Sequence, residues 1–214
     1  MDLPFSTKQF LDVFGLYNTS VWPAQYFLIL LAIVSIFFSA YKTKSSSKII
    51  SSSLAILWLW IGIVYQFIFF SPINKAANFF AVLFILQSLL FFYFGVIKNN
   101  LNFLYKNKVQ IVISILLFLY ALIFYPLLGV AFGHSYPRFP TFGLPCPTTI
   151  FTFGLLLLIE SKIKRWLIII PVIWSFIGFT AALKLGILQD IGLLVSAIVV
   201  LSYILLENKI KETV

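Results

Sequence analysis

Long uncharged apolar segments alternate along this chain with short polar connections. The segments cover residues 21–40, 49–70, 72–96, 109–130, 147–158, 166–183 and 191–206. A membrane-spanning helix needs about 20 apolar residues, and most of these segments approach that length. The fifth is short unless its helix begins near Leu144 or continues through Glu160 to Lys162. The pattern predicts an all-α integral membrane protein with about seven transmembrane helices.

Basic residues are distributed unevenly between the connections. The N-terminal segment and every second connection carry one Lys or Arg, whereas the intervening connections and the C-terminal segment carry two or three. Positive charge is enriched on the cytoplasmic side of membrane proteins. We therefore expect the N-terminus outside and the C-terminus in the cytoplasm. The net charge of +9 follows from this distribution, so no nucleic-acid partner is expected.

The N-terminal segment has a helical pattern of its own. Ser6 and Gln9 have the spacing of a capping box. Apolar residues then repeat at helical intervals at Phe10, Val13, Phe14 and Tyr17. We expect residues 1–20 to form an outer amphipathic segment on the membrane surface, followed by the transmembrane domain (21–206) and a cytoplasmic tail (207–214).

Two pairs of similar sequences predict an internal repeat. Residues 22–27 open the first span as residues 146–151 open the fifth, and residues 58–62 resemble residues 174–178. Three helices, a linker helix and three more in the same orientation would be similar to small sugar transporters of the SWEET class. The proline-glutamine signature of those transporters is not matched. Chance similarity between aromatic-rich apolar segments is the alternative interpretation.

The connection between the fourth and fifth segments is the longest and is rich in proline, so we expect a rigid cap over the outer surface. Pro147 suits the first position of a helix, which would make Cys146 the cap residue and leave the amides of Thr148 and Thr149 free. Such a helix end can bind an anion or activate the thiol. The alternative is a buried structural cysteine beside capping threonines.

His134 is the only histidine of the chain, and with Cys146 it would supply two ligands to a metal. A zinc site takes three or four protein ligands, so Asp190 or Tyr125 would have to join them through the fold. The sequence therefore leaves metal and cofactor unknown.

Polar residues concentrate in the predicted outer half, where they could line a vestibule. The candidate ligand-binding residues are Gln25, Tyr65, Gln66, Asn74, Asn78, His134, Cys146, Thr148 and Thr149. The alternative is that they form interhelical hydrogen bonds or belong to the interfacial aromatic belt.

Charged residues make up only 10% of the chain, against about 25% in soluble domains, and none lies near the middle of a predicted span. Proton relays, voltage sensors and retinal counter-ions are therefore disfavoured. The sequence contains no HExxH, no GxSxG and no phosphate loop, and the absence of these motifs disfavours an enzymatic function.

Several short sequences together resemble one family of small polytopic bacterial membrane proteins of unknown function. They are residues 16–18, 21–25, 58–60, 73–77, 125–127 and 142–149, with Gln87. The resemblance covers essentially the whole chain and implies a protein of the bacterial inner membrane. It carries no reaction, ligand or catalytic residue.

We expect a small transporter, or a channel-like or ligand-binding membrane protein, whose site opens to the outer side near the 131–146 loop. One alternative is a membrane-embedded enzyme or metal handler that uses Cys146. Another is a structural or sensory subunit whose partner contacts Asp190, Lys184 and Arg138. The expected partners are the lipid bilayer and a small solute or ion, and the oligomeric state stays open.

Overall fold

The computed structural model describes residues 3–105, 107–159 and 165–212, and the chain there is built from helices. In chain order these are α1 (Thr7–Ser20), α2 (Ala24–Ala40), α3 (Ser46–Trp60), η1 (Ile61–Phe70), α4 (Ala77–Phe91), η2 (Phe92–Ile97), α5 (Lys108–Leu119), η3 (Tyr120–Phe124), α6 (Tyr125–Ala131), α7 (Pro145–Leu157), α8 (Arg165–Leu185), η4 (Leu188–Asp190) and α9 (Ile191–Glu212). The segments η1, η2 and η3 are π-helical continuations of the preceding helices, and η4 is a short 3-10 turn.

Five helical runs among the described residues are long and apolar enough to cross a membrane. They are Ser46–Phe70, Ala77–Ile97, Lys108–Ala131, Trp166–Leu185 and Leu188–Leu206. The pair α1 and α2 adds a sixth if it is counted as one span bent by 88°. The all-helical prediction is therefore confirmed, with five or six helices of spanning length where the sequence predicted about seven.

The helix α7 accounts for the difference between these counts. Its 13 residues rise about 20 Å, which is less than the roughly 30 Å of a bilayer core. It begins at Pro145, close to the start near Leu144 that was one of the two alternatives for a longer helix. The alternative continuation from Glu160 to Lys162 lies outside the described residues.

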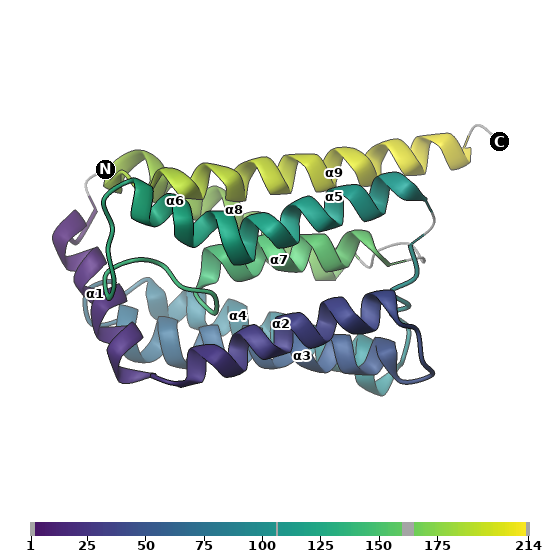
Figure 1. The fold of residues 1–214 in the computed structure, drawn as a ribbon, viewed down its shortest axis with the longest axis horizontal. Helices are drawn as coiled ribbons and strands as arrows, with labels where there is room; N and C mark the ends of the chain where they lie inside the picture. The colour runs from purple at the N-terminus through teal and green to yellow at the C-terminus, as the bar shows by residue number, and fades with distance from the viewer. Residues whose placement is uncertain (1–2, 106, 160–164, 213–214) are drawn as a thin grey trace.

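Figure 1 shows α7 enclosed between two groups of helices. One group contains α2, α3 and α4, in which α3 lies between the other two. The second contains α5, α6, α8 and α9, and α7 packs against α5, α8 and α9 as well as touching α3. Because α7 contacts both α8 and α9, the second predicted triplet is packed differently from the first, and the internal repeat stays a prediction.

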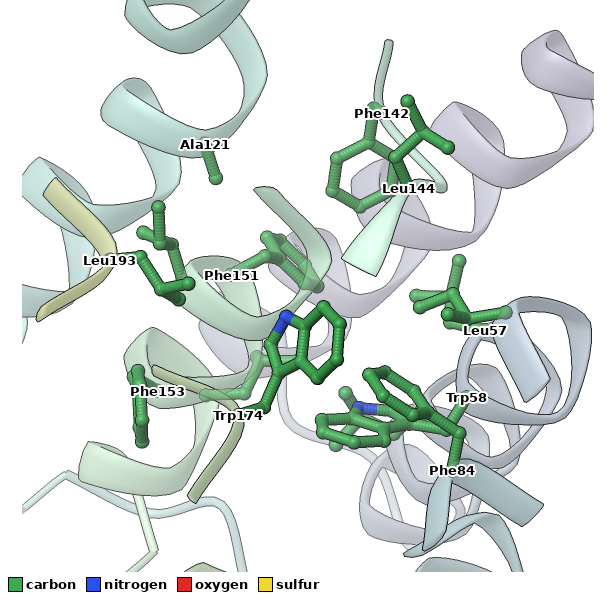
Figure 2. Close-up of a cluster of buried hydrophobic side chains, with 14 of the residues drawn as sticks. Leu57, Trp58, Phe84, Ala121, Phe142, Leu144, Phe151, Phe153, Trp174 and Leu193 are labelled. Carbon is green, nitrogen blue, oxygen red and sulfur yellow. The ribbon is translucent and has the colours of Figure 1, made fainter. Parts of the chain in front are cut away.

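Aromatic side chains connect the two groups around α7. Trp58 stacks on Phe84 with 4.8 Å between ring centroids, and Phe84 meets the edge of Trp174 at 5.0 Å (Figure 2). The indole N–H of Trp58 donates to the hydroxyl of Thr152 on α7 at 3.0 Å. This cluster fixes α3, α4 and α8 around the central helix. Because the indole N–H of Trp58 has a partner, the fold avoids the free-energy cost of a buried, unpaired donor.

The far end of α7 is satisfied by side chains of α5. Gln110 donates to the carbonyl of Leu157 at 3.0 Å, and Ser114 donates to the carbonyl of Gly154 at 2.8 Å. The last carbonyls of a helix have no partner within it, and in an apolar environment each needs a donor. These polar residues of α5 therefore serve the packing of α7.

The N-terminal helix α1 crosses the end of the bundle at 88° to α2. The predicted capping box is present: Ser6 is the N-cap, and its side chain and that of Gln9 bond reciprocally to the backbone. The buried face of α1 contains Phe10, Phe14 and Tyr17. An amphipathic helix was thus correctly predicted here, and the structure shows that it packs on the protein.

Asn18 attaches α1 to the loop that precedes α7. Its amide donates to the carbonyls of Pro137 and Phe139 at 2.7 and 2.9 Å, and its side-chain oxygen accepts from the Thr141 hydroxyl at 2.8 Å. The side chain is fully buried. One asparagine therefore satisfies three groups of a proline-containing loop that forms few backbone hydrogen bonds.

Replacing this asparagine tests its role in holding the loop. We expect Asn18→Ala to lower the free energy of unfolding by about 2–4 kcal/mol, because buried carbonyls lose their donors. Thermal unfolding in detergent measures the loss. The neighbouring Thr19→Ala is the control, since its hydroxyl bonds only within α1. Equal unfolding temperatures for the two variants would show that Asn18 does not hold the loop.

Candidate functional site

A cavity of about 290 Å³ lies beneath α1, at the end of the bundle that contains the N-terminus. Its walls come from α1, η1, the start of α4, α6, the start of α7, the second half of α8, and η4. Small-molecule sites typically measure about 300–1,000 Å³, so this cavity has the size for a small ligand. Its lining is mostly apolar and strongly aromatic, with a few polar side chains.

The one charged residue of the described cavity lining is Asp190, which is only 2% exposed. The hydroxyl of Tyr125 donates a short hydrogen bond to its carboxylate oxygen Oδ1. The thiol of Cys146 also interacts with the Asp190 carboxylate. These three residues come from η4, α6 and α7, so the fold brings together side chains that are far apart in the sequence.

Asp190 has no Lys or Arg within ion-pair distance among the described residues. It directly precedes α9, and the Cys146 thiol that it contacts lies in the first turn of α7. The positive ends of helix dipoles favour a negative charge at such a position. Burial still opposes an unpaired carboxylate, so Asp190 needs a proton or a cation for balance.

One hydrogen-bond donor of the cavity lining is buried without a partner in the described part of the chain. It is the indole N–H of Trp174, whose side chain is nearly buried. Gly178 makes room beside Trp174, because a Cβ there would lie 3.4 Å from the Cys146 sulfur and 2.6 Å from Leu193. A buried donor without a partner costs free energy, which a ligand with an acceptor atom would recover.

The start of α7 differs from the prediction. Leu144, not Cys146, is the N-cap, and its carbonyl accepts the N–H of Thr148 at 3.3 Å. Pro145 and Pro147 carry no N–H, so within this turn the free donor is the amide of Cys146. The predicted pair of free amides at Thr148 and Thr149 is therefore wrong, and the helix end is a poor anion site.

Three of the nine predicted ligand-binding residues line the cavity, namely Tyr65, Asn74 and Cys146. Thr148 and Thr149 follow Cys146 on α7 and are buried, but they are not part of the lining. Thr149 donates to the carbonyl of Pro145 at 2.8 Å, which is a bond within the helix. The threonines thus belong to the packing of α7.

The other four predicted residues lie away from the cavity. Gln25 donates to the carbonyl of Asn18 at 2.7 Å and belongs to the attachment of α1. Gln66 is fully buried, and its amide has no partner among the described residues. Asn78 is exposed, and His134 follows α6, where partial burial lowers its pKa. His134 and Cys146 are therefore not brought together as a metal site.

The sequence named Asp190 and Tyr125 only as extra metal ligands, and Asp190 also as a docking charge on the outer face. The structure places both at the cavity beside Cys146, and burial excludes Asp190 from the proposed docking surface. No group of three or more His, Cys, Asp or Glu within the described ranges could hold a metal ion. Trp174 was missed, because an aromatic in an apolar span carries no distinguishing signal.

Helix α1 and the loop before α7 together form the cover of the cavity, and an ion pair at the surface holds the two parts together. The Arg138 Nε lies 2.8 Å from Asp12 Oδ1, and the Lys8 Nζ lies 3.0 Å from Asp12 Oδ2. The pair joins α1 to the loop before α7. Both side chains are substantially exposed, so the pair contributes little to stability by itself and mainly sets the register of the cover.

Fold and cavity together define an all-helical protein with five or six helices apolar enough to cross a membrane and a buried carboxylate, that of Asp190, beneath its N-terminal helix. The chain belongs to a family of unknown function, DUF6064, which matches residues 7–213. No curated protein and no solved structure matches it. The predicted membership of an uncharacterised family is confirmed.

The ion pair of the cover gives a pH dependence with a definite sign. The pKa of Asp12 lies below the usual 3.8, chiefly because Lys8 donates a hydrogen bond to it, with a further lowering by the charge of Arg138. The stabilisation is therefore present above about 3.8 and is lost as the pH falls through the lowered value. Wild type should unfold at a higher temperature than Asp12→Asn at pH 6, and this difference should shrink steadily as the pH is lowered below 3.8 towards about 2. A difference that is undiminished near pH 2 would contradict this assignment.

Proposed function

We propose that the protein is a multi-pass membrane protein that binds a small solute in the cavity beneath α1, as a transporter, a channel-like protein or a ligand-binding protein would. One observation carries the proposal: a mostly apolar cavity has a buried acid, Asp190, and a buried indole N–H, that of Trp174, which has no partner among the described residues. A cluster of this kind costs stability, and a binding site is a reason for a fold to retain it.

The proposed topology has seven segments in the bacterial inner membrane, with the N-terminus outside and the C-terminus in the cytoplasm. The alternation of basic residues supports it, and so does the arrangement of the chain. The α2–α3 and α4–α5 connections, which contain basic residues, lie at the same end of the bundle as the C-terminus (Figure 1). The short helix α7, which the other helices enclose, would bring the number of segments in this topology to seven. The cavity then opens to the outer side.

Single cysteines test this orientation. In a Cys146→Ser background, which has no other cysteine, Ser135→Cys and Thr43→Cys place a thiol at exposed positions near opposite ends of the bundle. We expect an impermeant maleimide to label position 135 in intact cells and position 43 only after permeabilisation. The reverse pattern would show that the topology is inverted. Labelling of both positions in intact cells would show that they lie on the same side of the membrane, which would contradict the proposed topology.

A thiol-dependent enzyme and a metal handler are the competing proposals, and the surroundings of Cys146 support them less well. A reactive thiolate needs a basic or cationic neighbour, whereas Cys146 adjoins Asp190, Tyr125 and Trp174. His134, the predicted second ligand, lies outside the cavity lining. The third proposal, a subunit that docks on a partner through charges on its outer face, is also less well supported, because Asp190 is buried and not available at the surface. Solute binding is thus the function that the geometry supports best.

The single cysteine provides a direct test of the cavity. Cys146 lines it and is half-buried, so we expect methyl methanethiosulfonate to modify the folded protein in proteoliposomes. Ala76 also lines the cavity and is exposed, so Ala76→Trp should narrow the opening and slow the modification by about tenfold or more, as steric exclusion of a small reagent requires. Mass spectrometry of the intact chain follows the rate.

The matched control is Ala131→Trp, an exposed alanine of α6 outside the cavity lining. It should leave the modification rate unchanged. If Cys146 reacts only after unfolding in detergent, or if Ala76→Trp and Ala131→Trp react equally fast, the proposed solute cavity is not accessible and the proposed function fails.

A further inference from the structure

The polar groups of the cavity have a defined chemistry that restricts what can bind there. Asp190 offers an anionic acceptor, and its carboxylate has no basic partner among the described side chains. A neutral or anionic solute would leave this buried charge uncompensated. A cation would neutralise it, and the start of α9 keeps the charge in place for that purpose.

Aromatic rings form much of the remaining wall. Tyr65, Phe70, Phe80 and Trp174 all line the cavity, and so do Phe10 and Phe14 of the covering helix. The rings support one another: Tyr65 stacks on Phe70 at 5.7 Å, and Phe80 meets Trp174 edge-on at 5.5 Å. Aromatic faces attract organic cations through their quadrupoles, most strongly where water is excluded.

The size and the apolar walls distinguish between kinds of cation. A bare metal ion needs several hard or soft ligands in one place, and the described residues supply no group of three. An ammonium group with alkyl substituents needs one carboxylate and an aromatic surround instead. The Trp174 N–H, which has no partner among the described residues, could in addition bind an oxygen acceptor on the same molecule.

We propose that the cavity binds a small organic ammonium cation, with its charged nitrogen between Asp190 and the aromatic rings of Tyr65 and Trp174. This inference rests on the proposed function, because it names the class of solute for the same cavity. It assigns Asp190 as the counter-ion of the solute, and Tyr125 as the residue that positions the Asp190 carboxylate.

Three probes of nearly equal shape separate charge from size. Choline is the cation, 3,3-dimethyl-1-butanol is its neutral isostere, and 3,3-dimethylbutanoate is an anion with the same tert-butyl group. Each is added to the purified wild-type protein while methyl methanethiosulfonate modifies Cys146, and its dissociation constant is taken from the concentration that halves the rate. We expect choline to bind at least about tenfold more tightly than the neutral isostere, and the anion to bind least.

The variant Asp190→Asn should bind choline and the neutral isostere equally, because the amide removes the counter-charge while keeping the shape. Glu212→Gln is the matched control: it makes the same acid-to-amide change at the other end of α9 and should keep the preference for choline. The comparison of probes on wild type needs no variant, so it holds even if Asp190→Asn fails to fold.

Two different failures can be told apart. If Cys146 is modified and Ala76→Trp slows the reaction, but choline protects no better than the neutral isostere or no probe protects, the cation class is overturned while the solute cavity stands. If the Ala76→Trp test itself fails, the proposed function falls and this inference falls with it.

Discussion

A helix of 13 residues cannot cross a bilayer alone, and this constraint shapes the molecule around α7. Every residue of α7 except Cys146 is buried, so protein must cover the helix on all sides. The helices α3, α5, α8 and α9 do so. At its C-terminal end, Gln110 and Ser114 donate to its carbonyls, because no water is available to them inside an apolar bundle. The aromatic cluster of Trp58, Phe84 and Trp174 then joins the two helix groups across it.

At its N-terminal end, α7 is not covered so completely. Because the helix starts within the bundle, the preceding loop must fold inward to reach Leu144, and α1 must cover what remains. Asn18 and the Asp12–Arg138 pair hold this cover in place. The space left beneath it is the cavity, and its central polar groups come from η4, α6 and the start of α7. The short helix and the candidate site are therefore two results of one arrangement.

The sequence predicted the helices well, because apolar length and capping patterns are local properties. The capping box at Ser6 and Gln9 and the family membership were both predicted from the chain. The site was only partly readable. Tyr65, Asn74 and Cys146 were found by their polarity in the outer half, whereas Trp174 looked like any aromatic in an apolar span. The partnership of Asp190 with Tyr125 depends on the meeting of η4 with α6, and no local pattern reports that contact.

The position of Asp190 explains why its burial could not be predicted from charges in the middle of the apolar segments. The residue lies at the beginning of α9, where a charge ordinarily faces water or headgroups, and the sequence accordingly assigned it to the outer surface. In the structure, its burial comes from the elements around the cavity and not from its depth along its own helix. A charge at the end of a span can thus be as desolvated as one at its centre when a covering helix and a re-entering loop exclude water. Such a group needs something to balance its charge, just as an acid in the middle of a membrane does. No described side chain does so for Asp190, so a proton or a bound cation must.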